Sequence, residues 1–422
     1  MLKKIFSNNY IIPSHYFIFI DQIVVSAGNF LLSIIILRFL GLEAFGIFSF
    51  YWLFLLLINS LQTSYIISPM LTNAPKQNHS TVNYFYGGVL IQQLIFTLLI
   101  SFIIFITLKY LSNFSSIYQT EDNYLQFSLI VIATQFYQFL RRLLFSKNLS
   151  FRALLGDFVT YFLLIISLLY LNFIEQFILT NVWWLFFYTF LLGCIINLSI
   201  IFTLDYKFKN SYETIKENWI IGKWLLVTSL SQWFSGNLWL VNAGLILGPY
   251  TFGIIRACQT LLNISNIIFQ SIENFIPAAV TRKFEFGGIK EMDIYLKKFT
   301  IKYLIITSLI VFMIILFSKY LLDFFYGNET ANHYQILIYL SLIIPINFLQ
   351  YPLNYGFRTL AKTKPIFISF LCSTIFALLA SKIIITNFKI QGLIFGLYAS
   401  QIIILFLLYF SYYQLKKKIK QN

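Results

Sequence analysis

Charged side chains are scarce in this sequence. Only 11% of its 422 residues are Asp, Glu, Lys or Arg, whereas 59% are hydrophobic and 20% are aromatic. A water-soluble domain carries about 25% charged residues, so the composition excludes an ordinary soluble enzyme. It also excludes intrinsic disorder, which requires low hydrophobicity and high charge. Apolar runs of about 20 residues recur along the chain, and each can cross a bilayer as a helix. The sequence therefore predicts an all-α polytopic membrane protein.

Cysteine and histidine are also rare, with three of each. Cys194, Cys258 and Cys372 lie in separate apolar runs, so they predict neither a disulfide framework nor a CxxC metal site. The histidines show no HExxH spacing, and the chain contains no GxxxxGK[ST] phosphate loop. We therefore expect no metal site, no cofactor and no catalytic residue.

Charges and turn residues divide the apolar sequence into about twelve predicted transmembrane helices. The first apolar run lacks a short hydrophobic stretch before a small-residue cleavage site, so it is expected to be a retained span. The connections between spans are too short for a separate soluble domain. The predicted spans cover residues 16–38, 44–68, 84–108, 124–146, 151–171, 180–204, 219–246, 250–278, 299–318, 334–357, 365–385 and 391–413.

The net charge of +15 would suggest nucleic acid as a partner of a soluble protein. Here most Lys and Arg fall in loops on one side of the predicted membrane, Arg141 and Arg142 among them, so lipid replaces nucleic acid as the expected partner. This asymmetry predicts a multi-pass protein with both termini in the cytoplasm. Arg256 alone is counted as lying well within a span. The basic residues assigned to the outer side are Arg38, Lys109, Lys319, Lys382 and Lys389.

The two halves of the chain resemble each other at an offset of 207 or 208 residues. The segment LGLEAFGI at residues 40–47 is repeated as LGPYTFGI at residues 247–254, and Pro69 is repeated as Pro277. Six spans per half make equivalent helices parallel. The sequence thus predicts two six-helix bundles, residues 1–210 and 211–422, related by an axis along the membrane normal, an arrangement associated with carriers that bind substrate between the halves.

Three segments resemble a known family. They are Leu40 to Met70 (LGLEAFGIFSFYWLFLLLINSLQTSYIISPM), Phe139 to Asp157 (FLRRLLFSKNLSFRALLGD) and Leu247 to Arg282 (LGPYTFGIIRACQTLLNISNIIFQSIENFIPAAVTR). They are similar to lipid-linked oligosaccharide (O-antigen) flippases of the polysaccharide transporter family, in the multidrug/oligosaccharidyl-lipid/polysaccharide flippase superfamily. The resemblance implies that the two six-helix bundles surround a central cavity. It also implies outward flipping of a polyprenyl-diphosphate-linked oligosaccharide by alternating access. It further implies a bacterial inner membrane, a role in surface polysaccharide biosynthesis and a polysaccharide polymerase as a partner.

Polar residues within the predicted spans are candidates for function, because a charge at a helix centre costs about 2.5–3.5 kcal/mol on insertion scales. The planar guanidinium of Arg256 suits a diphosphate, and its counterpart in the first half of the chain is Ser49. A structural pairing of Arg256 with a carboxylate is the alternative. The candidate substrate-binding residues are Arg256, Arg38, Asn237, Asn242, Gln259 and Asn263. The asparagines serve equally well as hydrogen-bonding contacts between helices.

Three carboxylates are candidates for coupling transport to H⁺ or Na⁺: Asp21, Asp157 and Glu273. Each also has a structural alternative. Asp157 can pair with Arg152, or with Arg141 and Arg142, near the inner surface. Glu273 can pair with Arg282, and Asp21 can extend to the inner surface. Trp183, Trp184 and Trp219, near span ends, are expected at the membrane interface.

Two other functions remain open at this point. A multidrug antiporter of the same superfamily would place carboxylates and aromatics around a cationic drug. A membrane glycosyltransferase or polymerase would need acidic residues in a sizeable outer loop, and the outer loops offer only Glu121, Asp122 and Asp323.

Overall fold

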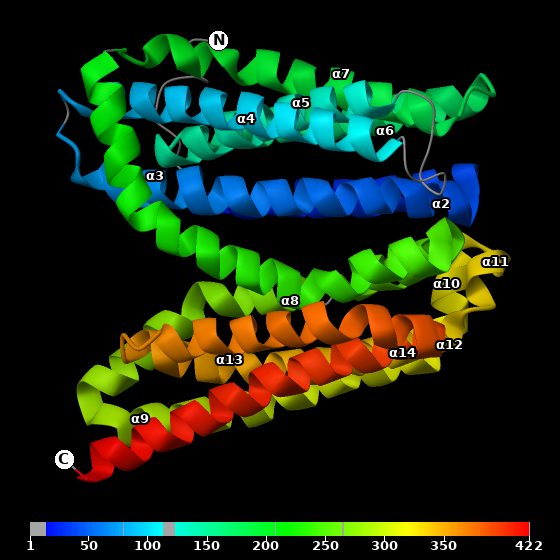
Figure 1. Ribbon diagram of the computed structural model, residues 1–422. Coiled ribbons are helices and arrows are strands. Elements are labelled where there is room, and N and C mark those ends of the chain that lie inside the picture. The colour runs from blue at the N-terminus through cyan, green and yellow to red at the C-terminus, as the bar shows by residue number, and fades with distance from the viewer. Residues whose placement is uncertain (1–13, 79, 113–122, 207, 264–265, 422) are drawn as a thin grey trace. The chain divides into compact units, whose positions relative to one another are not determined.

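The computed structural model describes residues 14–78, 80–112, 123–206, 208–263 and 266–421. Within these ranges the chain forms helices joined by turns and contains no β-strand (Figure 1). Eight of the helical stretches are long and apolar enough to cross a membrane. The all-α polytopic architecture predicted from composition is confirmed.

Four long helices contain residues whose backbone departs from helical geometry. They are α2 (Ser14–Gln62) at Gly41, α8 (Phe208–Leu262) at Gly248, α9 (Asn266–Leu316) at Gly287 and Gly288, and α14 (Lys364–Gln421) at Lys389. Each departure falls between two predicted spans. The long helices are therefore pairs of spans joined by tight bends rather than single crossings.

The chain divides into two compact units. Unit 1 consists of residues 1–40 and 51–226, and unit 2 of residues 41–50 and 227–422. The boundary lies inside α8, and ten residues of the first half belong to unit 2. We keep residues 1–210 and 211–422 as the proposed halves of the repeat, because that division rests on the sequence offset.

In unit 1, α5 packs against α4 and α7, and α6 packs against α7 (Figure 1). The largest buried side chains include Tyr137, Phe139, Trp183 and Phe186. Trp183 is 2% exposed, so the expectation that it lies at the interface is wrong. After α2, the elements of this unit are η1 (Thr63–Ile67, a π-helix), α3 (Ser68–Asn73), η2 (Ala74–Lys76), α4 (Val82–Ser112), α5 (Asn123–Ser146), α6 (Ser150–Phe173), α7 (Leu179–Asn197) and η3 (Leu198–Thr203).

In unit 2, α13 packs against both α9 and α14 (Figure 1). Trp239 of α8 is fully buried and donates a hydrogen bond from Nε1 to Ser400 Oγ of α14 at 2.8 Å. Toward the C-terminal end of α14, Lys416 forms an ion pair with Asp293 of α9. Besides α9 and α14, the elements here are α10 (Ser318–Tyr326), α11 (Asn328–Ala331), α12 (Tyr334–Ser341) and α13 (Ile343–Thr359).

The repeated glycines adopt the same backbone conformation. Gly41 has φ 79° and ψ 175°, and Gly248 has φ 84° and ψ 171°. A positive φ is strained for residues with a side chain, which explains glycine at both positions. The sequence repeat at this point is therefore also a repeat of backbone geometry.

Gly46 and Gly253 are a second pair of repeated glycines. Within unit 2, each lies against the helical segment that contains the other. A Cβ atom on Gly46 would lie 1.9 Å from the carbonyl oxygen of Pro249, and one on Gly253 would lie 2.2 Å from that of Leu42. Positions 42 and 249 are equivalent in the repeat, as are 46 and 253. The contact is thus reciprocal, and only glycine permits the two backbones to approach this closely.

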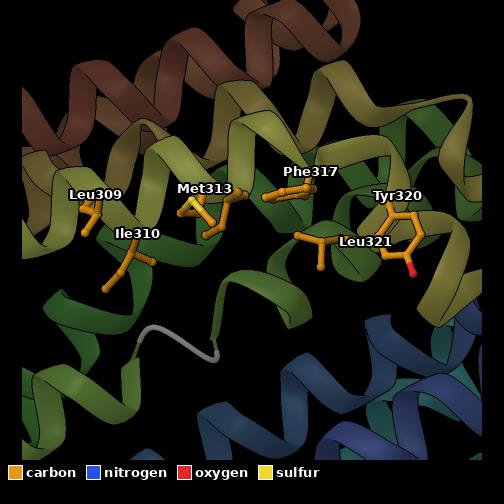
Figure 2. A pocket seen from close by; sticks show the side chains of 7 residues that line it. Leu309, Ile310, Met313, Phe317, Tyr320 and Leu321 are labelled. Carbon is orange, nitrogen blue, oxygen red and sulfur yellow. The ribbon is translucent and has the colours of Figure 1, made fainter.

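An apolar groove lies on unit 2 where α9 ends and α10 begins. Figure 2 shows its side chains, with the Tyr320 hydroxyl at one end. The groove is lined by Leu309, Ile310, Met313, Ile314, Phe317, Tyr320 and Leu321. Several of them are largely exposed, Leu309 at 61% for example. Such a surface is compatible with lipid and not with water.

Candidate functional site

Unit 1 contains a buried cluster of charged side chains drawn from three helices. Tyr137 and Arg141 lie one turn apart on α5, so they share a face. Asp21 comes from α2 and Asp157 from α6. Exposure is 0% for Asp21, Tyr137 and Asp157 and 4% for Arg141. We call these four residues the charge cluster.

The guanidinium of Arg141 connects both carboxylates of the charge cluster. Its Nη2 donates a hydrogen bond to Asp21 Oδ2, and its Nε forms an ion pair with Asp157 Oδ2. The Tyr137 hydroxyl donates to Asp157 Oδ1. Because desolvated charges must be paired to be tolerated, these contacts account for how two carboxylates are kept inside the helix bundle.

The charges in the cluster do not balance. Two ionised carboxylates against one guanidinium leave a formal charge of −1, and Asp21 Oδ1 has no hydrogen-bond partner within the described part of the chain. The guanidinium of Arg142, the next residue of α5, also attracts Asp21 and Asp157 and offsets part of this charge from outside the cluster. A bound proton or a small cation at a carboxylate would likewise offset it.

The structure corrects the sequence analysis at Arg141. That residue was assigned to an inner loop and Arg256 was taken as the lone basic residue inside a span, but Arg141 is buried in α5. The signal was available, because Arg141 falls within the predicted span 124–146. The pairing of Asp157 with Arg141 was one of the structural alternatives and is confirmed, whereas the pairing of Asp21 with Arg141 and the hydrogen bond from Tyr137 were not predicted.

The structure places the three carboxylates predicted for ion coupling differently. Asp21 and Asp157 lie in one cluster, and burial of Asp21 is inconsistent with extension to the inner surface. Asp157 pairs with Arg141, while Arg152 donates to Ser199 Oγ at 2.7 Å. The side chain of Glu273 lies outside the described residues.

Unit 2 contains a different kind of buried arginine. Arg256 lies on α8 after Gly248, and its Nη1 donates a hydrogen bond to Gln259 Oε1 at 2.9 Å. Its Nε is shielded from solvent and has no hydrogen-bond partner among the side chains that the structure describes. Among those same side chains, no carboxylate pairs with Arg256. A guanidinium held this way retains donors for an anionic ligand.

The remaining predicted binding residues are not gathered into one group. Asn237 Nδ2 donates to the backbone oxygen of Trp233 in its own helix at 2.9 Å. Asn242 Nδ2 donates to Ser381 Oγ of α14 at 2.6 Å and so joins two helices. Arg38 is an exposed residue of unit 1, and Asn263 is exposed at the end of α8. Arg256 and Gln259 are in direct contact.

The fold can be compared with known proteins. Residues 225–382 match the MatE family. The chain is similar to the solved structure of a lipid II flippase, MurJ, in an inward closed conformation, with a TM-score of 0.69, 14% identity and coverage of 94% of this chain and 87% of that one. It is also similar to an inward-facing multidrug resistance MATE family transporter of the MOP superfamily, with a TM-score of 0.74, 12% identity and coverage of 96% and 99%.

A third similar structure is a MOP superfamily transporter from Pyrococcus furiosus Vc1, described as having a binding pocket of reverse polarity. Its TM-score is 0.63 at 12% identity, with 94% of each chain covered. No curated protein sequence matches the chain. The chain has the fold of these transporters.

That fold agrees with the superfamily that the sequence segments resemble. The MatE match covers α8 from residue 225 onward, and so includes Arg256. The charge cluster lies outside the matched range, at Asp21, Arg141 and Asp157. The MatE match therefore includes Arg256 and does not include the charge cluster.

Proposed function

We propose that this chain is a flippase that moves a polyprenyl-diphosphate-linked oligosaccharide from the cytoplasmic to the outer leaflet by alternating access. The observation that carries the proposal is Arg256, a buried guanidinium that no described carboxylate neutralises. A structural arginine in such a place would be paired. An unpaired one suits an anionic ligand such as a diphosphate.

The direction of transport follows from electrostatics. Moving one charge across the membrane changes its free energy by about 2.3 kcal/mol per 100 mV. Outward movement of about two negative charges from a negative interior therefore gains about 4–5 kcal/mol per 100 mV. This driving force acts whether or not an ion is exchanged.

The charge cluster supplies a candidate for ion coupling. Its formal charge of −1 is neutralised by one H⁺ or Na⁺ at Asp21 or Asp157, and release of that ion restores the desolvated charge. Coupling in this form would bias unit 1 between two states by the cost of an unpaired buried charge. Arg38, Asn237, Asn242, Gln259, Asn263 and Glu273 stay in the proposal as secondary candidates.

The setting proposed for this activity is a bacterial inner membrane with both chain termini in the cytoplasm. The asymmetric distribution of Lys and Arg supports that orientation. The substrate class implies surface polysaccharide biosynthesis, with a polysaccharide polymerase as a partner.

A multidrug antiporter is the second candidate, supported by the MatE match and by two carboxylates in one buried cluster. Carboxylates suit a cationic drug, but those of unit 1 are already engaged by Arg141. An unpaired guanidinium such as that of Arg256 repels a cation. The charge arrangement thus favours the anionic substrate.

Reconstitution tests the proposal directly. The purified chain is placed in liposomes whose inner leaflet carries a fluorescent polyprenyl-diphosphate oligosaccharide, and the fraction reaching the outer leaflet is measured by quenching. We expect flipping faster than in protein-free liposomes. Transport of an organic cation such as ethidium, with no flipping of the lipid-linked sugar, would contradict the flippase and support the antiporter.

A further inference from the structure

Unit 1 contains a second cluster of buried polar side chains, and its members are uncharged amides. Asn59 and Gln62 lie one turn apart on α2, and they meet Gln93 of α4 and Gln135 of α5. Gln62 is 1% exposed, and Gln93 and Gln135 are fully buried. We call these four side chains the amide cluster.

The hydrogen bonds of the amide cluster converge on Gln135. Its Nε2 donates to Asn59 Oδ1 at 2.5 Å, and its backbone oxygen accepts Gln62 Nε2 at 2.6 Å and Gln93 Nε2 at 3.5 Å. Gln93 Nε2 also donates to Thr97 Oγ1 at 2.7 Å. The amide nitrogens of all three glutamines are therefore occupied.

The side-chain oxygens of two of these glutamines, in contrast, are unpaired among the described residues. Gln93 Oε1 and Gln135 Oε1 are both buried, and neither has a hydrogen-bond partner in the part of the chain that the structure describes. A buried unpaired carbonyl oxygen costs about 1–3 kcal/mol. What the cluster lacks is a donor or a cation and not another acceptor. Asn59 Oδ1 and Thr97 Oγ1 each keep a further lone pair for such a partner.

The helix beside the cluster is irregular at this point. Gln62 directly precedes the π-helix η1, and Gln92 Nε2 donates to the backbone oxygen of Tyr65 within it at 3.3 Å. A single π-turn in an α-helix is uncommon and frequently marks a functional site. The irregular turn and the unpaired oxygens occur within one stretch of the bundle, although they are independent observations.

We propose that the amide cluster binds a small monovalent cation through the side-chain oxygens of Gln93 and Gln135. Amide and carbonyl dipoles can replace the hydration shell of a monovalent ion without a compensating carboxylate. Divalent ions fit poorly, because Ca²⁺ and Mg²⁺ sites rely on carboxylates and the cluster contains none. The site is separate from the charge cluster, and its occupancy does not depend on what the protein carries.

Thermal unfolding of the purified full chain tests the site. Tryptophan fluorescence reports Tm in detergent, with NaCl replacing choline chloride at constant ionic strength. A ligand that binds only the folded state raises Tm with its concentration, so we expect a saturable rise of a few degrees. LiCl and KCl series identify the ion size, and a saturable rise with either supports the same site. No rise with any of the three ions would leave water as the partner of these oxygens and overturn the proposal.

Two variants and one control locate the effect. Gln93→Leu and Gln135→Leu should each abolish the cation-dependent rise, because each removes one oxygen ligand. Gln126→Leu is the matched control: Gln126 also lies on α5 with a buried, unpaired Oε1, but it belongs to no part of the cluster. A cation-dependent rise retained by both cluster variants, or lost equally in the control, would contradict the assignment.

A third variant tests the site in case the leucine variants do not fold. Gln93→Glu keeps the length of the side chain and adds a negative charge, so it should strengthen cation binding about tenfold or more. Binding of ²²Na⁺ should be displaced by unlabelled Na⁺ and not by choline, and the wild-type chain should bind one ion more than Gln93→Leu. Absence of displaceable binding to the wild-type chain would overturn the proposal even if every variant misfolds.

Discussion

The two units each bury an arginine, but they treat it in opposite ways. In unit 1, Arg141 contacts two carboxylates, and the tyrosine one turn away bonds one of them. In unit 2, Arg256 donates a hydrogen bond to the amide oxygen of Gln259, and no carboxylate among the described side chains pairs with it. The first guanidinium is the counter-ion of two buried carboxylates, and we propose that the second binds an anionic ligand.

The comparison teaches that burial alone does not identify a binding residue. By depth, Arg141 is the more buried of the two. The two differ in how their charge is paired, because Arg141 meets two carboxylates and no carboxylate among the described side chains pairs with Arg256. If this distinction is correct, removing Arg141 should damage the protein itself, whereas removing Arg256 should damage only transport.

The largest effect on stability is expected for Arg141→Leu. Breaking a buried ion pair by removing one partner costs about 3–5 kcal/mol, and here two carboxylates lose their partner. We expect a marked fall in Tm and in the yield of monodisperse protein on size-exclusion chromatography. Adding Asp21→Asn and Asp157→Asn to Arg141→Leu should restore much of the yield, because the buried charges then disappear together. An unchanged Tm for Arg141→Leu would show that Arg141 does not stabilise the protein, and would contradict the contrast drawn here between Arg141 and Arg256.

The largest effect on transport at normal stability is expected for Arg256→Gln. A hydrogen bond to a charged group contributes about 1.5–3 kcal/mol, which corresponds to a loss of roughly 10- to 100-fold in flipping rate. Arg256→Lys keeps the charge but loses the two-pronged geometry, so its loss should be smaller. Complementation of surface polysaccharide and the membrane protein level are measured together.

Lys382→Gln serves as the control for Arg256, because Lys382 is an exposed basic residue of the same unit. It should flip substrate at the wild-type rate. If Arg256→Gln accumulates normally and also flips at that rate, the ligand role is wrong. If it fails to accumulate, Arg256 is structural after all and the contrast with Arg141 disappears.

An intermediate effect is expected for Asp21→Asn. The substitution removes the excess negative charge and leaves Arg141 paired with Asp157, so Tm should change little. Transport driven by the membrane potential should persist, while stimulation by an imposed H⁺ or Na⁺ gradient should be lost. Flipping in liposomes with and without each gradient measures this. Full stimulation retained by the variant would exclude the charge cluster from coupling.

The smallest effect is expected for Lys416→Met. Lys416 pairs with Asp293, but their side chains are 29% and 16% exposed. Exposed or partly exposed pairs contribute about 0–1 kcal/mol, so Tm should fall by no more than a few degrees. Comparing the fall in Tm of this variant with that of Arg141→Leu measures how much burial increases the contribution of an ion pair to stability. A fall equal to that of Arg141→Leu would remove burial as the explanation.

Local sequence signals predicted much of the fold. Apolar length gave the spans, and the repeated glycines located bends whose backbone angles agree within a few degrees at Gly41 and Gly248. These features depend on residues close together in the chain. A glycine with positive φ follows from its immediate neighbours and needs no knowledge of the tertiary structure.

The candidate sites depended on distant contacts and were predicted less well. Asp21 and Arg141 are 120 residues apart, and nothing in the periodicity of either helix says that they meet. The amide cluster was missed for the same reason, because isolated Asn and Gln residues in apolar helices look alike in sequence. The pairing of Asp157 with Arg141 was among the expected alternatives, but counting Arg141 with the inner loops hid its pairing with Asp21.

The reciprocal contact of Gly46 and Gly253 has a consequence for how such a chain can arise. When residue i of one copy touches residue j of the other and j touches i, the contact is isologous, as at the interface of a two-fold homodimer. Here the two copies are successive repeats in one polypeptide. A protein of half this length could associate through the same glycine, with its carbonyl at the equivalent of Leu42 facing the partner copy. Gene duplication and fusion would then convert a dimer interface into an internal contact that keeps glycine at both crossing positions, although Leu42 of one copy is Pro249 in the other.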